Sequence, residues 1–249
     1  LVFQDAVVSA VAPADGRYIV EVRESAYGGN GGCAYRLHIG TFPRPTAVYP
    51  AGGQLGQDIE VTFLGDATGP FKQTFKLPAE NRELFELEPK AGGQVAPSGN
   101  RFRLFPHGNN LEVEPNDEIA KATPGVLPKA FNGVIEKQGD IDYFKFAAKK
   151  GQVFNIECYA RRIRSGLDPV MNLYKADGGG IAGNDDSRGP DSYFRVTIPA
   201  DGDYFLRITD HLGRGAKDFV YRVEMTQPKV QLTTSIPRFS RYGQYRQWI

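Results

Sequence analysis

Six oxygen-bearing side chains stand in two short stretches of the sequence, residues 112–117 and 139–146. The first runs Glu-Val-Glu-Pro-Asn-Asp and the second Gly-Asp-Ile-Asp-Tyr-Phe-Lys-Phe. The proline and the alternation around it favour an extended backbone over a helix. Residues two apart in an extended chain point to the same side. If the two stretches pair, we expect these side chains to converge: Glu112, Glu114, Asn116, Asp117, Asp140 and Asp142.

Carboxylates and an amide oxygen are hard ligands of the kind that Ca²⁺ prefers. Without a cation, grouped acids repel one another, so such a site would be stable only when filled. The alternative is that these acids are solvated turn residues, because carboxylates beside Asn and Pro are common in loops. The spacing alone leaves both interpretations open.

Other stretches that could carry chemistry favour structural roles. The glycine-rich run at residues 177–186 lacks the acid pattern of an EF-hand and the Gly-Lys-Ser/Thr of a P-loop, so we predict a hairpin connection. Three arginines, at 161, 162 and 164, could meet a polyanion, but such residues at a strand end are usually a solvated rim. Tyr159, Tyr193 and Phe205 could form a flat binding platform, although packing is the preferred interpretation for each.

Catalysis finds little support in the sequence. The three histidines lie in separate segments, and no His-Glu-x-x-His, Gly-x-Ser-x-Gly or Cys-x-x-Cys motif is present. We therefore predict no active site within these residues. Cys158 follows Phe154 and Ile156 at alternate positions, which favours a small buried hydrophobic side chain over a disulfide with Cys33 or a reactive thiol.

Composition indicates an ordinary globular chain with many short strands. The 249 residues are 41% hydrophobic and 24% charged, with a formal net charge of +1. That balance steers the chain neither to nucleic acid nor to anionic membranes. Frequent glycine, proline and aromatic residues fit strands joined by tight turns. No stretch is long and apolar enough to span a membrane.

An internal repeat relates residues 5–39 to residues 191–225 without a gap, with nine identities in 35 positions. Both copies have a Pro-Ala-Asp-Gly turn followed by an alternating strand, a glycine-bearing loop and a second alternating strand. The predicted strands are residues 18–22 and 35–39 in the first copy, with polar partners facing outward in both copies, among them Arg222 and Glu224. Because the second copy has a front half from Glu112 to about Pro190, the first copy is expected to be the back half of a sandwich. Its partner strands are expected either in further chain before residue 1 or in another molecule.

Residues 44–109 have their own rhythm of short alternating strands, which predicts a small immunoglobulin-like sandwich with one possible helical turn at 80–88. We therefore predict an all-β chain of tandem β-sandwiches. Its expected parts are a C-terminal half-sandwich at 1–43, the immunoglobulin-like domain at 44–109, a complete sandwich at 110–227 and the start of a further β module at 228–249.

The stretch from Glu112 to Thr226 resembles the bacterial pre-peptidase C-terminal (PPC) domain, a jelly-roll-like sandwich. The resemblance rests on five stretches in the family's order: residues 112–117, 139–144, 167–174, 184–186 and 199–204. It is similar to the calcium-dependent collagen-binding domains of clostridial collagenases. That likeness implies that the six residues named above are the calcium ligands.

The resemblance further implies a non-catalytic module array in a larger secreted or cell-envelope protein, whose remaining domains would be its partners. The expected location is extracellular, periplasmic or at the cell surface. Two alternatives remain: an adhesion module for collagen-like protein or polysaccharide, and an accessory region of a secreted hydrolase whose catalytic domain lies outside these residues.

Overall fold

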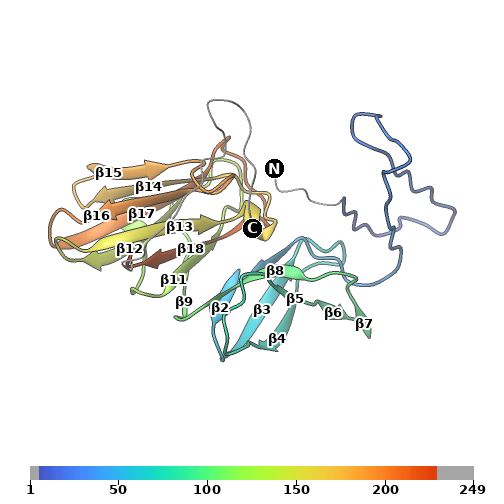
Figure 1. Ribbon diagram of the computed structural model, residues 1–249, viewed down its shortest axis with the longest axis horizontal. Coiled ribbons are helices and arrows are strands. Elements are labelled where there is room, and N and C mark those ends of the chain that lie inside the picture. The colour runs from blue at the N-terminus through green and yellow to red at the C-terminus, as the bar shows by residue number, and fades with distance from the viewer. Residues whose placement is uncertain (1–5, 229–249) are drawn as a thin grey trace, which may run out of the picture.

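The computed structural model describes residues 6–228 of the chain, and within them residues 47–226 form two sandwich-like pairs of sheets (Figure 1). The only helices in this range are two 3-10 helices, η1 (Ile119–Lys121) and η2 (Arg161–Ile163). Neither could cross a membrane, being far too short. The all-β prediction is confirmed, and the further module expected at 228–249 lies almost wholly outside the described residues.

The smaller sandwich is built from residues 47–105. One sheet has the order β1 (Ala47–Tyr49), β3 (Asp58–Leu64), β4 (Phe71–Lys76), and the other β2 (Gly52–Gln54), β8 (Asn100–Phe105), β5 (Phe85–Leu87). A separate hairpin joins β6 (Lys90–Ala91) to β7 (Gln94–Val95). Alternate residues of β3 and β8 turn inward and form the core with Val48, Leu77 and Leu87. The helical turn considered for 80–88 is not formed, because Phe85–Leu87 pairs with β8 instead.

The larger sandwich has two five-stranded sheets. The first has the order β10 (Thr123–Pro124), β12 (Asp142–Ala148), β17 (Gly202–Asp210), β14 (Pro169–Lys175), β15 (Gly180–Asn184). The second has the order β16 (Tyr193–Thr197), β13 (Val153–Tyr159), β18 (Val220–Thr226), β11 (Ala130–Val134), β9 (Asn109–Leu111). Strands β17 and β18 follow each other in the chain yet belong to opposite sheets.

Strand β18 is buried on both faces, which corrects one prediction. Arg222 and Glu224 were expected to face water, but they are 0% and 5% exposed. The smaller sandwich covers them: Arg103 of β8 donates to Glu224 Oε2 at 2.9 Å, and Arg222 Nε donates to Glu224 Oε1 at 2.8 Å. Arg222 Nη1 also donates to Asn109 Oδ1 at 2.7 Å. Alternation along a strand cannot reveal a second domain that packs on its outer face.

No strand lies between residue 6 and residue 46, where the sequence predicts strands at 18–22 and 35–39. Much of this segment loops out to one side of the smaller sandwich (Figure 1), and its last residues contact that sandwich, where Arg44 N donates to Asp66 Oδ2 at 2.6 Å. Its apolar side chains are exposed, with Val20 at 57% and Leu37 at 49%. The alternating pattern is present, but no neighbouring strand pairs with it.

Four smaller predictions are resolved by the structure. The run at 177–186 lies in the β14–β15 hairpin, with Gly178 at a φ of 80° in the connection, as expected. Cys158 is buried, Cys33 is exposed, and both are free. Arg162 and Arg164 are not a solvated rim, since they form ion pairs with Asp191 and Glu86. The three aromatic residues considered as a flat binding platform do not form one, because Phe205 is on the first sheet whereas Tyr159 and Tyr193 are on the second.

Candidate metal site

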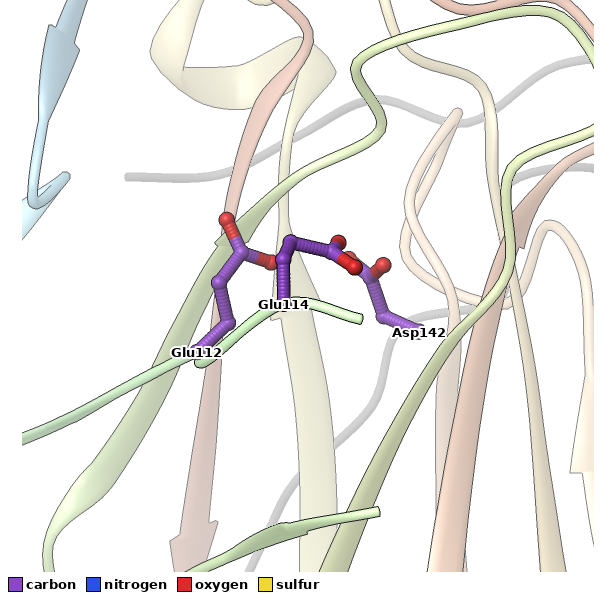
Figure 2. Close-up of side chains that lie close together, drawn as sticks. All are labelled: Glu112, Glu114 and Asp142. Carbon is purple, nitrogen blue, oxygen red and sulfur yellow. The ribbon is translucent and has the colours of Figure 1, made fainter. Parts of the chain in front are cut away.

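Three of the predicted ligands meet where the chain enters the larger sandwich. Glu112, Glu114 and Asp142 each offer a carboxylate oxygen, and these atoms all lie within 4.8 Å of one another. Figure 2 shows the three carboxylates pointing toward a common space. Glu112 and Glu114 follow β9 outside any strand, with a bend at Glu114, and Asp142 is the first residue of β12. The stretch after β9 therefore brings the two glutamates to the start of β12.

The backbone around Glu112 fixes one of its oxygens and leaves the other without a partner. Val134 N donates to Glu112 Oε1 at 2.8 Å. Glu112 Oε2 is buried without a hydrogen bond. A β-carbon at Gly133 would clash with this oxygen and with the Tyr221 hydroxyl, so the close approach of Glu112 requires glycine there.

Asp142 is held by a residue that sequence reasoning missed. Tyr221, on β18 in the opposite sheet, donates its hydroxyl to Asp142 Oδ2 at 2.5 Å. Both side chains are fully buried. The repeat marks Tyr221 as an inward residue, but nothing in the sequence shows that its hydroxyl meets an acid.

Asn116 is fully buried beside the three acids. Its carboxamide lies 3.2 Å from both Asp142 Oδ1 and Glu114 Oε1. With the amide nitrogen on that side, Asn116 donates to both carboxylates. With the oxygen on that side, the nitrogen faces Thr123 Oγ1 at 3.4 Å and a further oxygen joins the group. The first orientation suits acids without a cation, and the second suits acids around one.

The remaining two predicted residues lie at the edge of the group. Asp140 precedes β12 in a turn, where its Oδ2 accepts the Glu136 N–H at 2.6 Å. Its Oδ1 is buried without a hydrogen bond, although Lys137 Nζ lies 3.4 Å away. Asp117 is half-buried and outside the cluster. The turn, rather than an extended strand, separates Asp140 from Asp142.

Burial makes the negative charge of this group costly. It raises the pKa of Glu112, and the neighbouring Asp142 charge raises it further. Burial also raises the pKa of Asp142 and of Glu114, against hydrogen bonds that lower them. Carboxyls in this state either retain protons or require a compensating cation. The donor set offers oxygen only and includes the buried, unpaired Glu112 Oε2, so it fits a hard divalent ion.

A second group of acids escaped the sequence analysis. Asp168, Asp185 and Asp186 also bring carboxylate oxygens within 4.8 Å of one another. Asp185 Oδ2 lies 2.8 Å from His211 Nδ1. Such a group could hold a metal ion as well, but its residues are more exposed than Asp142. The Asn-Asp-Asp run at 184–186 was the available signal, and only the fold brings Asp168 to it.

Comparison with known proteins assigns part of this sandwich to a family. Residues 140–210 match the model of the bacterial pre-peptidase C-terminal domain. The match confirms the resemblance to the PPC family for residues 140–210. The match begins at Asp140 and ends at Asp210, so it does not include the glutamates of the entry stretch.

A probable subtilase-type serine protease of Deinococcus radiodurans is 37% identical over 99 residues, 39% of this chain. The match spans 14% of that protein's length. Among solved structures, the PPC domain of a Bacillus anthracis collagenase aligns in full with 46% of the chain, at 14% identity and a TM-score of 0.36. PliG of Aeromonas hydrophila, a periplasmic inhibitor of g-type lysozyme, aligns in full with 48%, at 13% identity and a TM-score of 0.33.

Proposed function

We propose that this chain is a non-catalytic accessory region of a larger secreted or cell-envelope protein, with Ca²⁺ stabilising the entrance of the larger sandwich. Glu112, Glu114, Asn116 and Asp142 would hold the ion, and Asp140 and Asp117 would complete the set. The observation that carries the proposal is the convergence of three carboxylates within 4.8 Å in a place where burial raises their pKa. The domain match at 140–210 and the protease relative support the accessory role.

The ion would join two parts of the fold that are distant in sequence. Glu112 and Glu114 belong to the connection between β9 and β10, whereas Asp142 begins β12. A cation there would neutralise the acids and fix this connection on the sheet. Two contacts hold the smaller and larger sandwiches together: Arg103 donates to Glu224 on the outer face of β18, and Asn109 Nδ2 donates to Gly52 O at 2.7 Å. The region would act as a stiff spacer that carries or positions other domains.

Thermal unfolding of the full chain in Ca²⁺ and in chelator tests the site. A ligand that binds only the folded state raises the Tm, by roughly 5 °C or more at saturating concentration. Glu114→Gln should abolish the calcium shift without lowering the Tm in chelator, because it removes one of the repelling charges. Asp177→Asn, at an exposed acid in the β14–β15 hairpin, is the matched control and should keep the shift. An unchanged Tm of the wild-type chain in chelator would reject the calcium site.

A second candidate function is adhesion to collagen-like protein or polysaccharide. The outer face of the first sheet groups Tyr143 and Tyr174, whose ring centroids lie 6.4 Å apart, beside Phe205 and Arg207. Aromatic faces of this kind provide contact area for extended ligands. Retention on insoluble collagen or polysaccharide, lost in Tyr143→Ala, would favour adhesion, whereas no retention would favour the spacer.

A further inference from the structure

The first copy of the repeat folds its turns in the same way as the second copy. In the second copy, Ala200 N donates to the Tyr204 hydroxyl at 3.4 Å, and that hydroxyl donates to Ala200 O at 2.7 Å. In the first copy, Ala14 N donates to the Tyr18 hydroxyl at 3.3 Å, and the hydroxyl again donates to Ala14 O. The Pro-Ala-Asp-Gly turn is thus closed by the same tyrosine at the same position.

The loop after the first strand is repeated as well. A carboxylate in each copy accepts the backbone N–H groups two and four residues later, at 2.7 to 3.0 Å: Glu24 from Ala26 and Gly28, and Asp210 from Leu212 and Arg214. Loops that share only composition would not place an acceptor on the same two donors. The loop geometry therefore belongs to the repeat.

The backbone conformation of this loop agrees at its one left-handed position, Tyr27 in the first copy and Gly213 in the second. Tyr27 has a φ of 61° and its N–H donates to Glu24 O at 3.1 Å. Gly213, its counterpart, has a φ of 65° and its N–H donates to Asp210 O at 3.0 Å. A positive φ is rare for tyrosine, so the turn imposes it. The first copy keeps this turn even though glycine has been replaced there.

Only the second copy forms strands, because only there do neighbouring strands pair with it. In the second copy, β17 pairs with β12 and β14, and β18 pairs with β11 and β13. These four partners all precede β17 in the chain. Since β17 and β18 lie in opposite sheets, they cannot pair with each other. The same reason explains why the first copy does not form a hairpin from residues 18–22 and 35–39.

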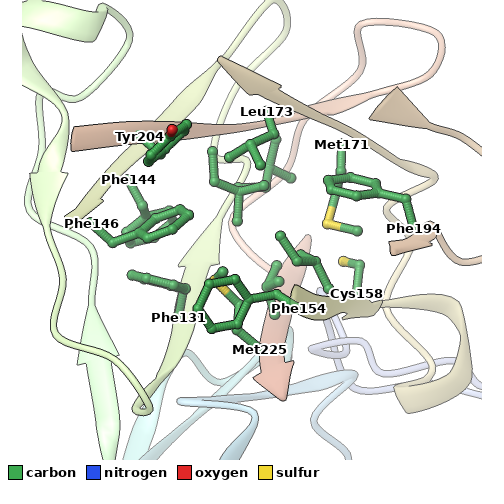
Figure 3. Packing of buried hydrophobic residues seen from close by; sticks show 14 of the residues in the cluster. Phe131, Phe144, Phe146, Phe154, Cys158, Met171, Leu173, Phe194, Tyr204 and Met225 are labelled. Carbon is green, nitrogen blue, oxygen red and sulfur yellow. The ribbon is translucent and has the colours of Figure 1, made fainter. Parts of the chain in front are cut away.

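Burial shows what the missing partners would cover. Tyr204 and Met225 lie in the core between the sheets (Figure 3), each 2% exposed. Their counterparts Tyr18 and Ile39 are 57% and 73% exposed. The two predicted strands of the first copy thus present an apolar side with no sheet against it. Exposed strands of this kind are ready to pair with further strands.

We propose that residues 6–40 are the closing strand pair of a further sandwich of the same type. Their apolar sides form a docking surface for strands equivalent to β11, β12, β13 and β14. The occupant is polypeptide on the N-terminal side of this segment in the same chain, because every partner of β17 and β18 precedes them in the second copy. This inference does not depend on calcium binding at Glu112.

Hydrogen exchange measured by mass spectrometry tests the docking. In a natural chain that includes the preceding residues, amides of 18–22 and 35–39 should exchange about 100-fold more slowly than in the 249-residue chain. Equal, fast exchange in both would overturn the proposal. Protection in the 249-residue chain together with a dimer in light scattering would show that a second copy supplies the strands, which would overturn the stated source.

A repeat-exchange chimera tests whether the segment encodes this strand pair. Residues 14–37 replace residues 200–223 in the full chain, which keeps Glu224 for Arg103. We expect cooperative unfolding and slow exchange in the grafted strands. The control graft has the same composition but exchanges neighbouring residues of the first strand: 18 with 19, 20 with 21 and 22 with 23. This exchange turns most of the apolar side chains outward, so the control should not unfold cooperatively. A chimera that unfolds no more cooperatively than this control would contradict the proposal.

Discussion

Residues 13–40 and 199–226 share their turns but not their strands. Tyr18 and Tyr204 close the first turn with the same hydrogen bonds, and Glu24 and Asp210 organise the same loop. Only the second copy forms strands, pairs them and buries them. The difference shows that contacts within five residues are encoded locally, whereas strand formation depends on partners distant in sequence. Each buried apolar side chain contributes about 1.5–3 kcal/mol, which the first copy lacks here.

The largest expected difference between the copies is at the shared arginine. Arg222 is fully buried against Glu224, Asn109 and Asn132, and its counterpart Arg36 is exposed. Removing one member of a buried, hydrogen-bonded network costs roughly 3 kcal/mol or more. Arg222→Ala should therefore lower the unfolding free energy by about that amount in urea titration, and Arg36→Ala should change it by less than ~0.5 kcal/mol. Equal losses would mean that the first copy is packed in solution.

Asp210 and Glu24, the acids of the two loops, should contribute differently to the free energy of unfolding at low pH. Burial opposes the charge of Asp210, but the Arg214 side chain and backbone N–H groups lower its pKa to about 2. Because the folded pKa lies below the unfolded one, this stabilisation is complete above about pH 4 and is lost as the pH falls toward 2.

Asp210→Asn should remove roughly 1–2 kcal/mol at pH 6 and flatten the acid limb of the unfolding curve. Glu24→Gln should leave that limb unchanged, because Glu24 is exposed and no packed strand depends on its loop. The measurement is urea unfolding between pH 2 and pH 7. An unaltered acid limb in Asp210→Asn would show that the contacts of Asp210 do not favour its ionised form.

The smallest expected difference is at the tyrosine of the turn. Tyr204→Phe removes a hydroxyl that donates to Ala200 O at 2.7 Å and should cost about 0.5–1.5 kcal/mol. Tyr18→Phe removes the same bond in an exposed turn and should leave the Tm of the chain unchanged. Calorimetry of the two variants would measure this contrast, and a comparable shift from Tyr18→Phe would show that the first turn supports a packed structure.

The candidate metal site also has residues that the sequence placed correctly and residues that only the fold brings in. Spacing along one extended stretch was enough to predict that Glu112, Glu114 and Asn116 lie together. Asp142 joins them because β12 starts beside that stretch, as the pairing of the two segments implied. Asp140 was placed less well, because a turn redirects its carboxylate toward Glu136 N. The roles of Tyr221 and Gly133 depend on β18 and β11 being neighbours, which no local pattern states.

Alternation and contacts over four residues act locally, so the all-β class, the inward residues of each strand and the turns of both repeats could be predicted from the sequence. Tertiary structure alone decided that Arg222 and Glu224 are buried, since a second sandwich covers the outer face of β18. It also decided that residues 18–22 stay unpaired while 202–210 form a central strand. A strand is stable only when neighbours satisfy its backbone and cover its apolar side, and those neighbours are chosen by topology.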